Sequence, residues 1–270
     1  MGWLINPMEK TTQNQEFIDF IQELANASGE IIRRYFRSGI AVETKSDQTP
    51  VTIADRRAEE TMRQLIQARY PGHGILGEEF AEVNPGAEYQ WILDPIDGTK
   101  TFVSGTYLFG TLIALLHDGK PILGAINNPI VNQFLVGDGS TTWLNGVPVK
   151  VRDCPSLEQA TLLTTSPLNV ARHRDGAAFD ALARRVKLFR TWGDCHGYFL
   201  VATGYADIMV DAAMSVWDVA ALIPVIEGAG GKITDYFGGD PMSSMGAVAT
   251  AGPLHAEVVA ALNPGPVDPR

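Results

Sequence analysis

The 270-residue chain is poor in cysteine and in positive charge. Its two cysteines, Cys154 and Cys195, lie far apart and have no CxxC or histidine-spaced partner, so the sequence supports neither a disulfide framework nor a zinc site. With 21 Lys and Arg against 31 Asp and Glu, the formal net charge is −10, which argues against binding to nucleic acid or to an anionic membrane. The five histidines show no i,i+4 pair on a predicted helix, so none is expected to be a metal ligand.

Internal repeats and low-complexity tracts are also missing, and we expect no targeting signal. Residues 1–7 have neither the basic start nor the long apolar core of a secretory signal, and Asn6 stands where a myristoylation motif has Ser or Thr. We therefore expect a cytoplasmic protein with loose termini at residues 1–12 and 263–270. Because 45% of the residues are hydrophobic, the rest of the chain can bury a full core as one large or two tightly joined domains.

The pattern of apolar residues predicts a mixture of helices and strands. Helical spacing between Phe17 and Ile32 predicts one helix, and a second runs from after Pro50 to about Tyr70. Residues 109–116, 122–127 and 133–136 are typical of antiparallel strands, and Asn145-Gly146 of a hairpin turn. After about residue 151 the predicted elements alternate between strand and helix: 162–165, 179–186, 188–191, 198–203, 208–210, 217–227, 233–235 and 254–262. The sequence thus predicts an α/β (α+β) protein with an N-terminal half at 13–150 and a layered α/β half at 151–262.

The segment Trp91–Thr99, with the sequence WILDPIDGT, is the most informative in the chain. Residues 89–93 read as a buried strand, which places Asp94 where the strand ends. Pro95 biases Asp94 toward an extended backbone and argues against a helix that carries both acids. Asp94, Asp97 and the Ile96 carbonyl can then converge as hard oxygen ligands for magnesium, calcium or manganese.

The Gly98-Thr99 turn follows with N–H groups that can face an anion, particularly where a helix begins. The alternative for an Asp-Pro-x-Asp-Gly segment is an ordinary surface turn. Two further acidic elements favour the metal site: Glu78-Glu79 ends the apolar stretch 74–76, and Asp218 opens an apolar segment that runs to residue 227. Adjacent side chains diverge in extended backbone, so only one of Glu78 and Glu79 should be a direct ligand. Asp218 alone would also suit a simple helix cap.

With these motifs in this order, the chain resembles the inositol monophosphatase-like phosphatases, a superfamily of magnesium-dependent, lithium-sensitive phosphomonoesterases that includes fructose-1,6-bisphosphatases. The resemblance covers residues 52–55, 77–79, 91–102 and 217–231, and the segment 190–198, RTWGDCHGY, is similar to the histidinol-phosphatase branch. It implies a stacked αβαβα sandwich with the site between the two halves. We also expect a homodimer that acts on a small phosphorylated metabolite.

The resemblance implies two or three Mg²⁺ ions in each site. Glu78, Asp94 and the Ile96 carbonyl would hold the first ion, and Asp94, Asp97 and Asp218 the second. If these acids and Asp55 converge, like-charge repulsion and burial make the metal-free cluster unfavourable, and divalent cations relieve both effects. Two ions at such a site can clamp the attacking and leaving oxygens of an in-line displacement at phosphorus.

By the same resemblance, Thr99 would orient the nucleophilic water and help deprotonate it, with Asp55 hydrogen-bonded to the Thr99 hydroxyl and able to help hold a third ion. Glu78 would share in this catalytic set. Gly98 and Thr99 N–H groups would bind the phosphate, and no covalent phosphoenzyme is expected. Without the resemblance, Asp55 reads as a solvated first-turn acid on an exposed helix face.

The substrate expected from this reading is L-histidinol phosphate, as in histidine biosynthesis, with inositol-1-phosphate as the alternative. Asp194 and Asp211 would offer carboxylates to a cationic amino alcohol, whereas inositol needs only hydroxyl partners. A metal-stabilised binding protein that lost turnover is a third hypothesis, against which the intact acid and threonine set speaks. His196 borders this wall as a minor candidate for substrate contact, and Arg172-His173-Arg174 is read as a solvated loop.

Overall fold

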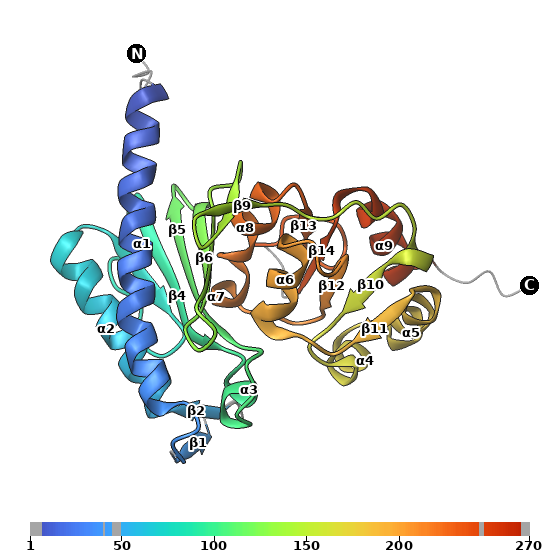
Figure 1. The fold of residues 1–270 in the computed structure, drawn as a ribbon, viewed down its shortest axis with the longest axis horizontal. Coiled ribbons are helices and arrows are strands. Elements are labelled where there is room, and N and C mark those ends of the chain that lie inside the picture. The colour runs from blue at the N-terminus through green and yellow to red at the C-terminus, as the bar shows by residue number, and fades with distance from the viewer. Residues whose placement is uncertain (1–6, 40, 45–49, 243–245, 266–270) are drawn as a thin grey trace, which may run out of the picture.

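The computed structural model describes residues 7–39, 41–44, 50–242 and 246–265 (Figure 1). Its helices are α1 (Pro7–Tyr35), α2 (Ile53–Arg69), α3 (Thr99–Val103), α4 (Pro167–His173), α5 (Gly176–Arg185), α6 (Asp194–Ala202), α7 (Val216–Val219), α8 (Leu222–Gly228) and α9 (His255–Leu262), with 3-10 turns at Leu157–Gln159 and Gly252–Leu254. In this part of the chain no helix has both the length and the apolar character that crossing a membrane requires.

The strands form two large sheets and one small hairpin. They are β1 (Val42–Thr44), β2 (Pro50–Thr52), β3 (Gly74–Gly77), β4 (Tyr89–Asp97), β5 (Gly110–His117), β6 (Lys120–Asn128), β7 (Gln133–Gly137), β8 (Thr142–Leu144), β9 (Val147–Val149), β10 (Thr161–Leu163), β11 (Leu188–Arg190), β12 (Ile208–Asp211), β13 (Lys232–Thr234) and β14 (Ala247–Thr250). The first large sheet has the order β3-β4-β5-β6-β7-β8-β9, with only β3 and β4 parallel. The second has the order β11-β10-β12-β14-β13, in which β10 runs parallel to β11 and β12.

The elements stack in five layers, which confirms the predicted αβαβα sandwich (Figure 1). Helices α1 and α2 cover one face of the seven-stranded sheet, α6 and α8 pack between the two sheets, and α5 and α9 lie on the far face of the five-stranded sheet. Both faces of the seven-stranded sheet are covered, and strand β4 is apolar on both. Its Trp91 and Leu93 join the core under α1 and α2, whereas Ile92 joins the core between the two sheets.

The two sheets lie on either side of the predicted boundary at residue 150, but they share one apolar core. The cluster between them contains Leu112 and Ile126 from the first sheet and Met209 and Ile233 from the second. Burying such a contiguous cluster stabilises both sheets together. The division of the chain into halves at 13–150 and 151–262 therefore stays a prediction.

Most of the predicted elements are present, and their ends differ for identifiable reasons. The loose extension predicted up to residue 12 is wrong for residues 7–12, which are helical, because a proline such as Pro7 fits the first turn of a helix, where its missing N–H has no partner. The helix predicted over 217–227 is divided into α7 and α8, since Pro224 lacks the N–H that would bond to the carbonyl of Ala220. Residues 1–6 and 266–270 lie outside the described residues.

The remaining comparisons between predicted and observed structure concern short segments. The predicted turn at Asn145-Gly146 joins β8 to β9, and both residues have the positive φ of such a turn, 49° and 80°. Strand β14, with the sequence AVAT, was not predicted, because four small residues give no periodic signal. At the C-terminus, Asn263 is not loose, since its side-chain amide donates to the carbonyls of Tyr236 and Val259 at 2.8 and 2.9 Å.

Candidate active site

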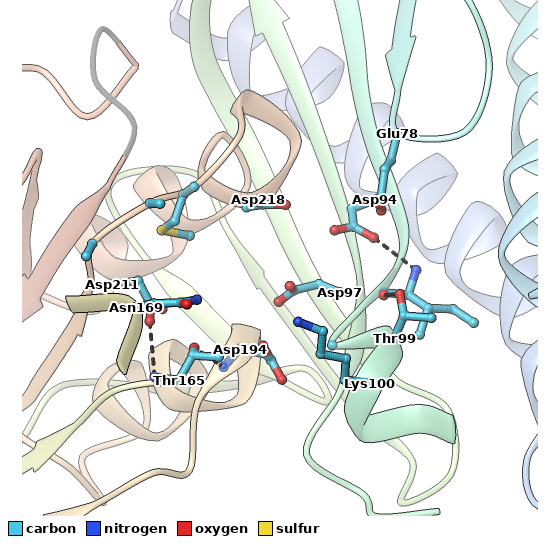
Figure 2. A pocket seen from close by; sticks show the side chains of 15 residues that line it. Glu78, Asp94, Asp97, Thr99, Lys100, Thr165, Asn169, Asp194, Asp211 and Asp218 are labelled. Carbon is cyan, nitrogen blue, oxygen red and sulfur yellow. Dashed lines mark hydrogen bonds between the residues drawn. The ribbon is translucent and has the colours of Figure 1, made fainter. Parts of the chain in front are cut away.

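One pocket, at the end of β4 and between the two large sheets, contains every predicted site residue except Asp55 (Figure 2). It is lined by Glu78, Asp94, Ile96, Asp97, Gly98, Thr99, Lys100, Thr165, Asn169, Asp194, Asp211, Ala212, Ala213, Met214 and Asp218. The pocket therefore brings together groups from β3 to α3 with groups from β10 to α7, as the sequence predicted for a site between two halves.

A bulge at the end of β4 turns Asp94 and Asp97 into this pocket. The predicted end of the strand at Asp94 is wrong, because β4 continues to Asp97, although its pairing with β5 shifts between the two acids. Pro95 has no N–H for the ladder, and the next N–H, that of Ile96, bonds instead to the Asp94 carboxylate at 3.0 Å. Asp94 is 2% exposed.

Asp218 reaches the same place from the other half of the chain. It is the third residue of α7, where its carboxylate accepts the backbone N–H of Ser215 at 2.7 Å and completes a capping box. One carboxylate oxygen from each of Asp94, Asp97 and Asp218 lies within 4.8 Å of the others. Burial and the neighbouring negative charges raise the pKa of Asp94 and Asp97 well above the usual range, and burial raises that of Asp218 to about 6.

Glu78 lies beside this cluster, just after β3. Its carboxylate is not part of the three-acid group within 4.8 Å, but it lines the pocket, and after burial its charge is the largest influence that raises the pKa of Asp94. The Glu78 N–H donates to the carbonyl of Leu93 at 3.2 Å and continues the β3–β4 pairing beyond the strand. Glu79, the other candidate, does not line the pocket.

Thr99 and Asp55 meet as predicted from the resemblance. The Thr99 hydroxyl lies 3.3 Å from Asp55 Oδ1 and 3.1 Å from the Ile96 carbonyl. Asp55 is fully buried behind Thr99, so the reading of this acid as a solvated surface residue is wrong. Its other oxygen accepts the N–H and the hydroxyl of Thr52 at 2.9 and 2.6 Å. Burial raises the pKa of Asp55, against the lowering effect of the Thr52 bonds.

Asp194 joins the two halves of the site. Its side chain accepts a hydrogen bond from Thr101 at 2.8 Å and packs against Gly98, at which a Cβ would lie 2.9 Å from Asp194 Oδ2. Its backbone has a φ of 49°, in the left-handed region that Asp and Asn adopt more readily than most residues. Burial raises the pKa of Asp194, while Thr101 and Lys100 lower it. The next N–H, that of Cys195, donates to Asp97.

Asp211 forms the deeper part of the same wall. It accepts the N–H of Thr165 at 3.1 Å and lies 3.3 Å from the Tyr198 hydroxyl. Burial raises the pKa of Asp211 to about 7, against the hydrogen bonds that lower it. A cation placed beside Asp211 would oppose that shift and favour the ionised carboxylate.

Lys100 and Asn169 line the pocket and were missed by the sequence reasoning. Within the part of the chain that the structure describes, Lys100 is the only lysine or arginine that lines the pocket, and Figure 2 shows it extending from α3 into the site. Its position directly after Thr99 was a signal that could have been used. Asn169 lies in the first turn of α4, far from any motif, and no local pattern marks it.

His196 and the segment 172–174 lie outside the pocket lining. His196 does not line the pocket; its ring stacks on Phe199 with centroids 5.8 Å apart, and burial lowers its pKa. The reading of residues 172–174 as a loop is wrong for Arg172 and His173, which form the last turn of α4, although both are solvent-exposed as expected. The Arg174 guanidinium packs over Tyr236 and Phe237, 5.3 Å from each ring centroid, away from the site. The cations of this segment thus do not line the pocket.

The donors that converge in the pocket fit a hard divalent cation. They are carboxylate oxygens from the cluster of Asp94, Asp97 and Asp218, with Glu78 and the Ile96 carbonyl beside them. No histidine or cysteine is among the described residues that line the pocket, so these offer no preferred ligand to the softer metals. Oxygen-only donors with several carboxylates suit magnesium, manganese or calcium.

Comparison with known proteins finds one family that matches almost the full chain. The model of the inositol monophosphatase family matches residues 13–265. A chloroplastic bifunctional phosphatase of Arabidopsis thaliana is 45% identical over 230 residues, which make up 84% of this chain and 66% of that protein. A histidinol-phosphatase of Chlorobaculum parvum is 40% identical over 249 residues, 91% of this chain and 96% of that protein. The solved structure of an inositol monophosphatase from Zymomonas mobilis has a TM-score of 0.83 at 37% identity, and the match covers 92% of this chain and 98% of that one.

These matches include every motif on which the resemblance was based, and the fold that it implied is the fold observed. The chain therefore belongs to the inositol monophosphatase family and is a phosphatase of that family.

Proposed function

We propose that the protein is a magnesium-dependent phosphomonoesterase that hydrolyses L-histidinol phosphate to L-histidinol and phosphate. The observation that carries the substrate is the charge of the pocket: among the described residues that line it, six carboxyl groups face one cation, Lys100. Four of the six, at Glu78, Asp94, Asp97 and Asp218, would hold the metal ions. The remaining two, Asp194 and Asp211, outnumber Lys100 on the wall that would face the leaving group. A cationic leaving group there would oppose the raised pKa of both and favour their ionised forms. A cationic amino alcohol suits that wall better than a neutral polyol.

Bound Mg²⁺ ions would have two effects that the carboxylate side chains alone cannot have. When bound by Glu78, Asp94, the Ile96 carbonyl, Asp97 and Asp218, two or three Mg²⁺ ions would lower the pKa of a bound water and neutralise charge on the phosphoryl oxygens. The raised pKa of Asp94, Asp97 and Asp218 without metal supports the same assignment, because it reflects a cluster that needs positive charge to be stable as carboxylates.

The chain's own groups would then orient the reactants. Thr99 would accept a hydrogen bond from the attacking water while its own hydroxyl donates to Asp55, and Asp55 could also help hold a third ion. The Gly98 and Thr99 N–H groups at the start of α3 would bind phosphoryl oxygens. Water attacks directly in this proposal, since the described residues that line the pocket include no activated nucleophile.

Inositol-1-phosphate is the alternative substrate, and it is supported by the 37% identity to the inositol monophosphatase of Zymomonas mobilis. The two substrates differ in the charge of the leaving alcohol, so they test the wall rather than the metal ligands. The proposed homodimer and the cytoplasmic location rest on the sequence alone, although Cys154 and Cys195 are both free and buried, as a reducing compartment permits.

The deciding experiment is a kinetic comparison of histidinol phosphate, inositol-1-phosphate, fructose-1,6-bisphosphate and 3′-phosphoadenosine 5′-phosphate, each with Mg²⁺ and followed as phosphate release. We expect the highest kcat/KM with histidinol phosphate. A higher value with inositol-1-phosphate would move the assignment to the alternative. Phosphate release from none of them would favour a binding protein that has lost turnover.

A further inference from the structure

A buried ion pair stands directly behind the segment that carries Glu78. Glu59 and Arg63 lie one turn apart on α2, with side chains 0% and 9% exposed, and Arg63 Nε donates to Glu59 Oε1 at 2.7 Å. The second oxygen of Glu59 accepts the backbone N–H of Glu79 at 2.9 Å. Neither residue lines the pocket, so the pair has no direct part in binding or chemistry.

Arg63 holds the same segment further along. Its two terminal nitrogens donate to the carbonyl of Ala81 at 3.0 Å and to that of Phe80 at 3.1 Å, and its guanidinium packs over the Phe80 ring, 5.7 Å from the ring centroid. The pair thus bonds to three consecutive residues after Glu78. A planar fork with several fixed donors is well suited to this task, because it sets the direction of each bond as well as its length.

On the other side of Glu78, Gly77 leaves room for the Glu59 carboxylate. A Cβ at Gly77 would lie 2.1 Å from Glu59 Oε1 and 2.4 Å from its carboxyl carbon. The Glu59 carboxylate therefore packs directly against the backbone at the end of β3. Glu78 is the residue between this contact and the bond to Glu79, so its backbone is fixed on both sides by a single side chain.

We infer that Glu59 and Arg63 are positioning residues that aim the Glu78 carboxylate into the metal site. A buried ion pair is weak support for stability by itself, since apolar residues of similar volume often serve as well. Its bonds to the Glu78 segment give it a more specific role. The inference rests on the proposed role of Glu78 as a ligand, and it assigns to α2 the task of fixing that ligand before any metal binds.

The test measures Mg²⁺ binding directly, by isothermal titration calorimetry with MgCl₂ and no substrate, together with the Mg²⁺ dependence of turnover. In Glu59→Gln the shape and the acceptor for Glu79 remain, but the charge that holds Arg63 is lost. We expect Mg²⁺ affinity to fall by roughly ten- to a hundredfold, as is usual when the partner behind a ligand is removed. At saturating Mg²⁺, kcat should recover to within a few-fold of the wild type.

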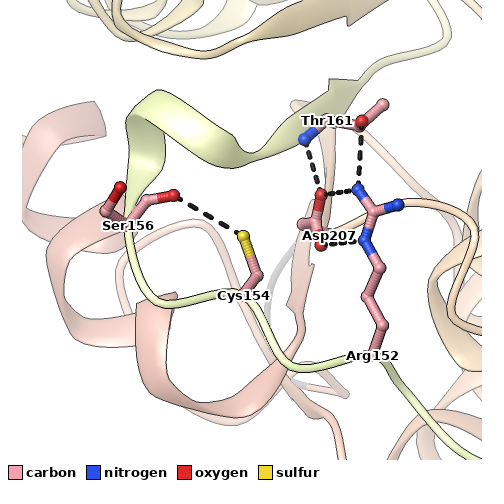
Figure 3. A network of polar contacts seen from close by, with 5 residues as sticks. All are labelled: Arg152, Cys154, Ser156, Thr161 and Asp207. Carbon is pink, nitrogen blue, oxygen red and sulfur yellow. Dashed lines mark hydrogen bonds and ion pairs between the residues drawn. The ribbon is translucent and has the colours of Figure 1, made fainter.

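The matched control is Asp207→Asn. Asp207 is also fully buried and paired with an arginine, Arg152, and it accepts the N–H of Thr161 at 2.6 Å (Figure 3). That network does not line the site, so its loss should lower the melting temperature and leave Mg²⁺ affinity unchanged. If Glu59→Gln behaves in the same way, the pair is purely structural and the inference is wrong.

Two further variants separate the possible failures. Arg63→Lys keeps the charge beside Glu59 but lacks the fork that reaches both Phe80 and Ala81, and it should also weaken Mg²⁺ binding; it decides the question if Glu59→Gln does not fold. Glu78→Gln tests the ligand itself. Unchanged Mg²⁺ affinity in Glu78→Gln would overturn the proposed ligand set, whereas a loss in Glu78→Gln with none in the folded Glu59 and Arg63 variants would overturn only the positioning role.

Discussion

Replacing Asp194 with Asn tests the proposed substrate with little change in structure. Asp194 has a φ of 49°, and Asn tolerates that conformation about as well as Asp, so the backbone at the start of α6 should be retained. The Asn side-chain carbonyl can still accept the Thr101 hydrogen bond that Asp194 Oδ2 accepts at 2.8 Å. What changes is the rest of the side chain, where a negatively charged acceptor is replaced by a neutral NH₂ donor.

The size of the effect follows from the kind of contact that is lost. A charge-assisted hydrogen bond to a desolvated partner is worth about 1.5 to 3 kcal/mol, which corresponds to roughly ten- to a hundredfold in kcat/KM. Asp194 is half-buried and lies beside Lys100, which offsets part of its charge, so we expect a loss near the lower end with histidinol phosphate. With inositol-1-phosphate or glycerol phosphate, kcat/KM should change by less than about threefold, because the metal ligands and Thr99 are retained.

The assay is phosphate release at saturating Mg²⁺ over a range of each substrate, with the ratio of the two kcat/KM values as the readout. Thr101→Val serves as the matched control, since it removes the hydrogen bond to Asp194 and keeps the carboxylate charge. That variant should retain most of the preference for the cationic substrate. Equal losses on both substrates in Asp194→Asn would show that Asp194 only supports the site structurally, and the charge argument for the substrate would be refuted.

Four other outcomes can be measured. Asp94→Asn, or Asp218→Asn, should nearly abolish turnover without changing the circular dichroism spectrum, whereas full activity of Asp94→Asn in metal-free buffer would contradict the metal site. Lithium should inhibit the wild type, and less so when Asp218 is altered; no inhibition at lithium concentrations well above those of Mg²⁺ would contradict the second ion position. Burial lowers the pKa of His255 to about 4, so the stability contributed by its neutral form is complete above the unfolded pKa of 6.5 and is lost as pH falls from 6.5 to 4. Denaturant unfolding should show a loss of up to about 3 kcal/mol in unfolding free energy over that range. The loss should be smaller in His255→Gln. Gly124→Ala should lower the unfolding free energy by about 1 to 3 kcal/mol or more, because its Cβ would lie 2.0 Å from the carbonyl of Ala221; an unchanged denaturation midpoint would contradict this tight packing.

Reasoning from the residues alone, without the family resemblance, reached only the parts of the site that local sequence determines. The segment from Trp91 to Thr99 contains a strand, a proline and a glycine, each with its own backbone preference, and these place two acids and a threonine at one strand end. The bulge that continues β4 to Asp97 was missed, because it depends on how β5 pairs with it.

Contacts between distant segments could not be reached in this way. The hydrogen bond from Thr101 to Asp194 joins residues 93 positions apart, and that from Cys195 to Asp97 joins residues 98 positions apart. The backbone N–H of Thr165 donates to Asp211 across 46 positions, a pairing that no spacing along the chain encodes. Asp194 and Asp211 both line the pocket, but their hydrogen-bond partners were not predicted, and their role in binding substrate stays a prediction.

Asp55 and Asp218 show how the fold arranges several acids in one buried place. Each is the third residue of its helix, and each gives one carboxylate oxygen to the N–H of the capping residue, Thr52 at 2.9 Å and Ser215 at 2.7 Å. This bond fixes the side chain locally and leaves the second oxygen to face the site, where that of Asp55 meets Thr99. The helix N-terminus also offers partial positive charge, which offsets part of the repulsion among the acids. Helix capping thus orients the Asp55 and Asp218 side chains, and this capping depends only on the sequence at each helix start. Long-range packing then needs only to bring the two helix starts together.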